Sequence, residues 1–127
     1  MTEKKLHKQI IDYIDLQYKG VVVQSDPNGL KTTIGQAFDI KARRLPKDGG
    51  HPDIFVYCTR GKLSGLFLEV KTEKNNPYKK NGELKKGEHI HKQAALHERL
   101  RAEGYSGGFA VGFDRAKAMI DDYMRLD

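Results

Sequence analysis

Two short apolar runs joined by a glycine-containing loop are the feature that most constrains the fold of this 127-residue chain. The runs cover residues 54–58 and 66–68, and the loop of residues 59–65 between them holds two glycines. Runs this short, rich in aromatic and branched side chains, favour strands over helices. The glycines favour a turn between antiparallel strands. The sequence therefore predicts a β-hairpin with charged residues at its open end.

Asp53 and Glu69 are predicted to lie on one face of this hairpin. Side chains alternate between faces along a strand, so Glu69 and Lys71 share a face. If the strands pair symmetrically around Lys62, Asp53 lies opposite Lys71 and Phe55 lies opposite Glu69. The two carboxylates are then diagonal neighbours, ~7–8 Å apart at Cα. Buried carboxylates are costly unless they are paired or bind a cation, and Mg²⁺ is a suitable partner.

The wider pattern around these carboxylates resembles a known family signature. It consists of Gly50-x-Pro52-Asp53, then Glu69-Val70-Lys71, then Gln93. This pattern resembles that of the VRR-NUC family (virus-type replication-repair nucleases) in the PD-(D/E)XK nuclease superfamily. The resemblance implies an α/β fold with a restriction-endonuclease-like core, in which helices flank a central mixed β-sheet in αβββαβ order. We expect a single domain over residues 1–127, which is an ordinary domain length.

The resemblance also implies a metal site that holds Mg²⁺ or Mn²⁺. Its ligands would be Asp53, Glu69 and the Val70 backbone carbonyl. Glu3 would be a further acidic catalytic residue that holds the ion directly or through water. Spacing alone gives Glu3 a second interpretation, because an acid in the first turn of a helix is also favoured by the helix dipole.

The same resemblance implies an enzyme that hydrolyses phosphodiester bonds in DNA. Lys71 would contact the scissile phosphate and the attacking water, and Gln93 would orient water or substrate. A lone inward glutamine such as Gln93 is otherwise a satisfied polar group in the core. Related proteins act on branched DNA, so a four-way (Holliday) junction or a flap is the expected substrate, and a homodimer fits a two-fold junction.

The charge of the chain is consistent with a polyanionic partner. The net charge is +6 and the isoelectric point is about 9.4. Two basic groups lie beside the hairpin in the sequence, before and after it. They comprise Lys41, Arg43, Arg44 and Lys47, and Lys74, Lys79, Lys80, Lys85 and Lys86 in the loop of residues 72–88. We predict that both groups bind DNA, with Tyr78 stacking on a base. The alternatives are a solvated helix end for the first group and a flexible insertion without a role for the second.

Apolar spacing predicts helices before, between and after the strands. Thr2 is a candidate N-cap for a helix that begins at Glu3, and Asp114 is one for the last helix. A further helix is predicted over residues 30–45. The helix over residues 88–103 carries one core-facing stripe, formed by His89, Gln93, Leu96 and Leu100. His97 falls outside this stripe and is predicted to lie at the surface or to contact phosphate.

A second class of function remains open from the sequence. The chain would then be a basic nucleic-acid-binding module that keeps the fold without turnover. Cys58 is the single cysteine and cannot form an internal disulfide, which fits a reducing compartment. No signal peptide or membrane-spanning run is visible, so we expect a cytoplasmic protein of a bacterial or phage-infected cell without a membrane partner.

Overall fold

The computed structural model describes residues 1–25 and 51–127 of the chain. Its elements, in order, are α1 (Glu3–Gln17), β1 (Val22–Ser25), β2 (Ile54–Tyr57), β3 (Leu66–Lys71), the short 3₁₀ helix η2 (Glu73–Asn75), α3 (Glu88–Ala102), β4 (Ser106–Val111) and α4 (Gly112–Met124). The helix predicted over residues 30–45 and the basic residues Lys41, Arg43, Arg44 and Lys47 lie outside the described residues.

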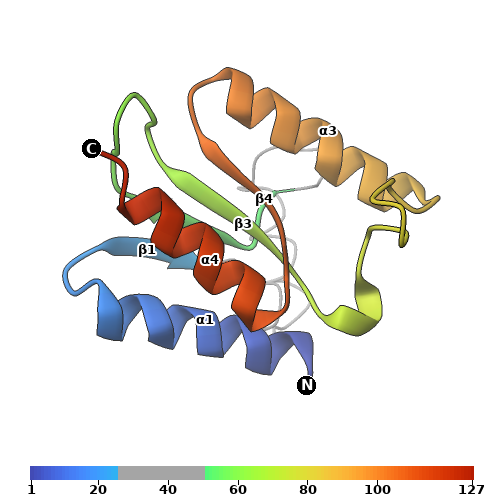
Figure 1. The fold of residues 1–127 in the computed structure, drawn as a ribbon, viewed down its shortest axis with the longest axis horizontal. Helices are drawn as coiled ribbons and strands as arrows, with labels where there is room; N and C mark the ends of the chain where they lie inside the picture. Colours follow the sequence, from blue (N-terminus) through green and yellow to red (C-terminus); the bar gives the residue numbers. More distant parts are fainter. Residues whose placement is uncertain (26–50) are drawn as a thin grey trace, which may run out of the picture.

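The strands form one mixed sheet in the order β1-β2-β3-β4 (Figure 1). The β1–β2 and β2–β3 pairs are antiparallel, and the β3–β4 pair is parallel. A parallel pair needs a crossover connection, and α3 supplies it here. The predicted central mixed sheet with flanking helices is therefore confirmed.

The helices lie on both faces of the sheet. Leu6, Ile10 and Ile14 of α1 are buried in a core that includes residues of β2, β3, β4 and α4. On the other face, the His97 ring of α3 contacts the rings of Phe67 and Phe109. Figure 1 shows α1 and α4 side by side, with α3 apart from them. Successive residues of β3 thus contribute to two separate layers of packing.

Helix α1 begins as its sequence predicts. The Thr2 hydroxyl accepts a hydrogen bond from the Lys5 amide at 3.2 Å, which satisfies one of the free N–H groups of the first turn. Among the described residues, no helix is both long and apolar enough to cross a bilayer.

The hairpin pairs in a different register from the predicted one. The observed β2–β3 pairs are Ile54–Leu68, Phe55–Phe67 and Val56–Leu66. Phe55 therefore does not face Glu69, and continuing the ladder by one residue places Asp53 level with Glu69 rather than with Lys71. The prediction that Asp53 and Glu69 share a face is nevertheless correct. The observed register differs from the predicted one by two residues, and a shift of two leaves every side chain on its original face.

The turn of the hairpin explains this difference. Arg60 and Leu63 exchange two backbone hydrogen bonds, of 3.0 and 2.9 Å, around a two-residue turn. Between this bridge and the Val56–Leu66 pair, the β2 side has three residues (57–59) and the β3 side has two (64–65). The extra residue is a bulge, which shifts the pairing of everything beyond it.

Gly107 lets β4 approach β3 closely. Its φ angle is +143°, and a Cβ at this position would lie 2.0 Å from the Phe67 carbonyl oxygen. A larger residue would push β4 away from β3, the strand that carries Glu69 and whose residues 66–70 are all buried.

Helix α4 begins three residues earlier than predicted. Val111 occupies the N-cap position and Gly112, with a φ angle of +79°, is the first helical residue. Asp114 therefore lies in the first turn, where a negative charge is favourable, and does not cap the helix.

Asp121 of α4 joins the last helix to the first. Its Oδ1 atom accepts hydrogen bonds from the Tyr13 and Tyr18 hydroxyls at 2.6 and 2.7 Å. The Lys117 ammonium donates to Oδ2 at 3.0 Å. Burial alone would raise the pKa of Asp121, but the hydrogen bonds from the two tyrosines and Lys117 outweigh it and lower the pKa from 3.8 to about 2. The ionised carboxylate is therefore part of the folded structure.

We predict that Asp121→Asn lowers the free energy of unfolding by roughly 1–3 kcal/mol at neutral pH, because it removes a charged acceptor of three hydrogen bonds. The native pKa of Asp121 lies below its unfolded value. The advantage of the wild type is therefore present above pH 3.8 and is lost as pH falls through about 2. Urea unfolding of both proteins across this window measures the difference.

Asp122→Asn is the matched control on the same helix. The Asp122 side chain is 72% exposed, with Arg125 at 3.5 Å, so its substitution should change stability by less than about 0.5 kcal/mol. Equal losses in the two variants would contradict the proposed role of Asp121.

Candidate active site

The structure brings together the carboxyl groups of Asp53 and Glu69, which we call the carboxylate pair. Glu69 lies in β3 and is only 2% exposed, whereas Asp53 directly precedes β2 and is partly buried. The Val70 amide donates to Asp53 Oδ2 at 2.7 Å. The two carboxyl groups are within hydrogen-bonding reach of each other. Residues 16 positions apart in the chain thus meet because β2 and β3 pair in the observed register.

The contact changes the acidity of Asp53. Burial, followed by the charge and hydrogen bond of Glu69, raises the pKa of Asp53 from 3.8 to about 8. The Val70 amide opposes this rise and the charge of Glu3 adds to it. Without a cation, the pair therefore holds a proton at neutral pH, since two buried carboxylates in contact resist double ionisation.

His97 belongs to this cluster, and its predicted surface position is wrong. It is 1% exposed, and its Nε2 atom lies 3.4 Å from Glu69 Oε1. Burial, then the charges of Arg101 and Lys71, lowers the pKa of His97 from 6.5 to about 4. The predicted stripe of α3 is also partly wrong, because His89 is exposed. The available signal was the spacing of four residues from Gln93, which places both side chains on one helix face.

Lys71 lies at the end of β3 on the same face as Glu69. Its Nζ atom is 6.0 Å from the centre of the Phe109 ring, a distance at which a cation is attracted to the ring face. Its charge also acts on His97. The ammonium group therefore lies on the α3 side of the sheet, which is the side that Glu69 faces.

Gln93 is buried one turn before His97 on α3. It is 5% exposed, and among the described residues no group donates a hydrogen bond to its Oε1 atom. A buried amide oxygen without a donor is unfavourable. Its predicted role in orienting water or substrate stays a prediction, and the free oxygen is consistent with it.

Glu3 is exposed at the start of α1. Its charge contributes to the raised pKa of Asp53, so it lies on the same side of the molecule. Within the described parts of the chain, no three acidic, histidine or cysteine side chains converge closely enough to hold a metal ion. The structure thus brings Asp53 and Glu69 together and leaves Glu3 at a greater distance. Its role as a ligand stays a prediction.

The carboxylate pair is chemically suited to a hard divalent cation. Both donors are oxygens, and the proton that they retain without a cation shows that a positive charge is favourable between them. The Val70 side chain is buried and its amide donates to Asp53, while the role of its carbonyl as a ligand stays a prediction. Asp53 and Glu69 are therefore the residues that could hold Mg²⁺ or Mn²⁺.

The loop of residues 72–88 leaves the site directly after Lys71. It contains η2 and a bridge between Tyr78 and Leu84. Its lysines are exposed: Lys74, Lys79, Lys80, Lys85 and Lys86. The Tyr78 ring packs edge-on against Phe109, with centroids 5.8 Å apart, and remains 38% exposed. The loop thus presents positive charge beside the carboxylate pair.

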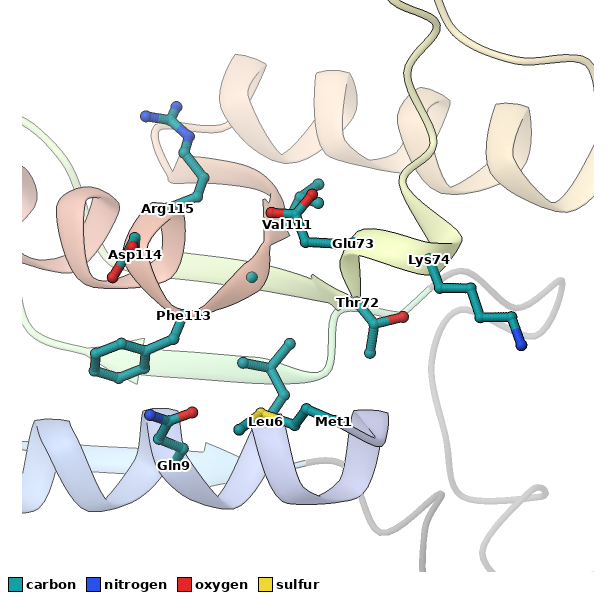
Figure 2. Close-up of a pocket in the computed structure, with 11 residues that line it drawn as sticks. Met1, Leu6, Gln9, Thr72, Glu73, Lys74, Val111, Phe113, Asp114 and Arg115 are labelled. Atoms are coloured by element: carbon teal, nitrogen blue, oxygen red, sulfur yellow. The ribbon is translucent and has the colours of Figure 1, made fainter.

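A hollow of about 780 Å³ lies near the ends of β3 and β4 (Figure 2). It is lined by parts of α1, η2 and α4, including Leu6, Glu73 and Phe113. In Figure 2, Lys74 extends away from the other labelled side chains. Neither member of the carboxylate pair lines this hollow, so we do not place the chemistry in it.

A known structure shares this architecture. A solved VRR_NUC domain protein superimposes with a TM-score of 0.65 at 23% sequence identity, covering 99% of this chain and 90% of that chain. A solved VRR_NUC domain gives a TM-score of 0.49 at 24% identity, with 97% and 99% covered, and supports no conclusion at that score. No protein-family model and no curated protein matches the sequence. The chain therefore has the fold of a VRR_NUC domain protein, and its restriction-endonuclease-like α/β core is confirmed.

We predict that Asp53→Asn stabilises the protein in EDTA at alkaline pH. The folded pKa of Asp53 is raised, so wild-type stability decreases as pH rises from 3.8 towards about 8. Asparagine can still accept from the Val70 amide and carries no charge. The melting temperature of the variant should exceed that of the wild type by at least ~3 °C above pH 8, and the gap should shrink in acid.

The control is Asp15→Asn, an exposed acid near the end of α1. Its melting temperature should follow that of the wild type at every pH. A wild type as stable as Asp53→Asn at alkaline pH would mean that the pair carries no electrostatic cost.

Proposed function

We propose that this protein is a metal-dependent nuclease of the VRR-NUC family that hydrolyses phosphodiester bonds in DNA. The observation that carries the proposal is the contact between the buried carboxyl group of Glu69 and the partly buried one of Asp53, with Lys71 on the same face of β3 as Glu69. The fold shared with a VRR_NUC domain protein supports it. A structural core gains little from two acids in contact, whereas a cation site requires them.

Asp53 and Glu69 would hold Mg²⁺ or Mn²⁺, with the Val70 carbonyl and Glu3 as further candidates. When bound, a divalent cation neutralises charge on the scissile phosphate and makes hydroxide available near neutral pH. The carboxylate pair must lose its proton for this, so cation binding should tighten as pH rises.

The neighbouring side chains supply the remaining functions. Lys71 binds the scissile phosphate and offsets the charge that builds up on it during cleavage. Gln93 offers its free Oε1 atom to a water molecule, which positions that water for attack. Both side chains lie on the α3 side of the sheet with Glu69, so the reacting phosphate approaches from that side.

The exposed lysines of the loop hold the DNA. Phosphate contacts of this type give affinity without sequence readout, so selectivity comes from the shape of the DNA. We therefore propose branched DNA, a four-way junction or a flap, as the substrate, and a homodimer as the form that acts on a two-fold junction.

Cleavage assays test the proposal. Wild-type protein should cut a labelled four-way junction or flap faster than plain duplex with Mg²⁺ or Mn²⁺, and EDTA should stop the reaction. Lys71→Ala should lower the cleavage rate by at least ~10²-fold, because it removes a charge that stabilises the transition state. Calorimetry should show that Lys71→Ala still binds Mn²⁺.

Lys62→Ala is the matched control, because Lys62 is an exposed lysine at the hairpin turn, at the far end of β3. Its cleavage rate should match that of the wild type. Binding of branched DNA without cleavage under every metal condition would instead support a nucleic-acid-binding module.

The loop lysines should set the salt dependence of DNA binding. Each phosphate contact contributes about −0.9 to the slope of log K against log salt for duplex DNA. Lys85→Ala with Lys86→Ala should therefore weaken binding and flatten the slope by up to ~2. Fluorescence anisotropy at a series of salt concentrations, with EDTA present, measures both effects.

A double variant with Lys19→Ala and Lys62→Ala provides the comparison, because it removes the same charge outside the loop. Its slope should stay close to that of the wild type. If both double variants change the slope equally, the loop has no special role in DNA binding.

A further inference from the structure

His97, on helix α3, contacts Glu69 of the carboxylate pair, on strand β3. It lies on α3, 28 residues along the chain from Glu69 in β3, and its Nε2 atom is 3.4 Å from Glu69 Oε1. Both side chains are almost completely buried, with side-chain exposures of 2% and 3%. We infer that His97 is a positioning residue, which holds the Glu69 carboxylate in the orientation that binds the metal ion. This inference rests on the proposed function.

The environment of the imidazole fixes its orientation. The ring centroid lies 5.2 Å from that of Phe67 and 4.8 Å from that of Phe109, with interplanar angles of 41° and 68°. Rotation of the ring would bring it into these aromatic neighbours. The direction in which Nε2 points is therefore set by packing and not by solvent.

The chemistry of the contact follows from the acceptor. An ionised carboxylate only accepts hydrogen bonds, so the Nε2 atom must carry the proton and donate it to Oε1. One oxygen of Glu69 is thereby engaged, which restricts rotation of the carboxylate. A ligand held in its binding orientation loses less freedom when a cation arrives, and partners of metal ligands commonly contribute about 10- to 100-fold to metal affinity.

The competing explanation is that His97 only fills space between two aromatic rings. Phenylalanine would then be a good replacement, because it keeps a ring of similar size and adds no polar group. Glutamine would be a poor replacement under this explanation, because it loses the ring. Under the positioning explanation glutamine would be the better replacement, because it keeps an amide N–H near the position of Nε2. The two explanations thus predict opposite orders for these variants.

Titration calorimetry with Mn²⁺ and no DNA distinguishes them. We expect His97→Phe to weaken Mn²⁺ binding by about 10- to 100-fold and His97→Gln to restore most of the affinity, with thermal unfolding as the test of folding. His89→Gln is the matched control, because His89 is an exposed histidine on the same helix, and its affinity should equal that of the wild type. The Asp53→Asn variant serves as the reference, because it gives the Mn²⁺ affinity that remains when a proposed metal ligand is lost.

A second measurement needs no variant at position 97. In wild-type protein with ¹⁵N-labelled histidine, the His97 ring signals should show the Nε2–H tautomer with Mg²⁺ bound. The Nδ1–H tautomer, or wild-type Mn²⁺ affinity in a folded His97→Phe, would overturn this inference and leave the proposed nuclease intact. A wild type that does not bind Mn²⁺ would overturn both.

Discussion

The electrostatic cost of ionising two carboxyl groups in contact is the constraint on which the rest of this structure depends. Asp53 and Glu69 are in contact where β2 and β3 pair, and burial together with the charge and hydrogen bond of Glu69 raises the pKa of Asp53 to about 8. The surrounding groups reduce this cost without removing it: the Val70 amide donates to Asp53, and His97 contacts Glu69. A chain selected for stability alone would place apolar residues here. This electrostatic cost is the reason for proposing a cation site here.

Much of the fold could be predicted from local patterns. The first helix follows from Thr2 and the apolar spacing behind it, and the hairpin follows from two short apolar runs. The shared face of Asp53 and Glu69 was also predictable, because alternation along a strand does not depend on register. The register itself depends on a bulge at residues 57–59. Several turns fit the polar residues between the strands, so the sequence does not reveal which strand carries the extra residue.

The part of the site contributed by α3 was harder to predict. Gln93 follows from the family pattern, but His97 does not, because a histidine followed by Glu98 and Arg99 has the local signature of a solvated position. Its burial depends on Phe67, Phe109 and Glu69, which lie on other elements. The four-residue spacing from Gln93 indicates the helix face of His97, but it does not identify these long-range partners. The start of α4 was also hard to predict, because it depends on a backbone angle. The positive φ angle of Gly112 places the first helical turn before Asp114 can cap it.

The bonds from Tyr13 and Tyr18 to Asp121 span 108 and 103 residues of sequence. On a ribosome, α1 emerges early and must wait for α4 before it can dock in its final place. The parallel partner of β3 also arrives late, because β4 follows α3. Non-local contacts of this kind form slowly and only once both segments are available. The loop of residues 72–88 is therefore synthesised before α3 and β4, the elements that pack around the Glu69 side of β3.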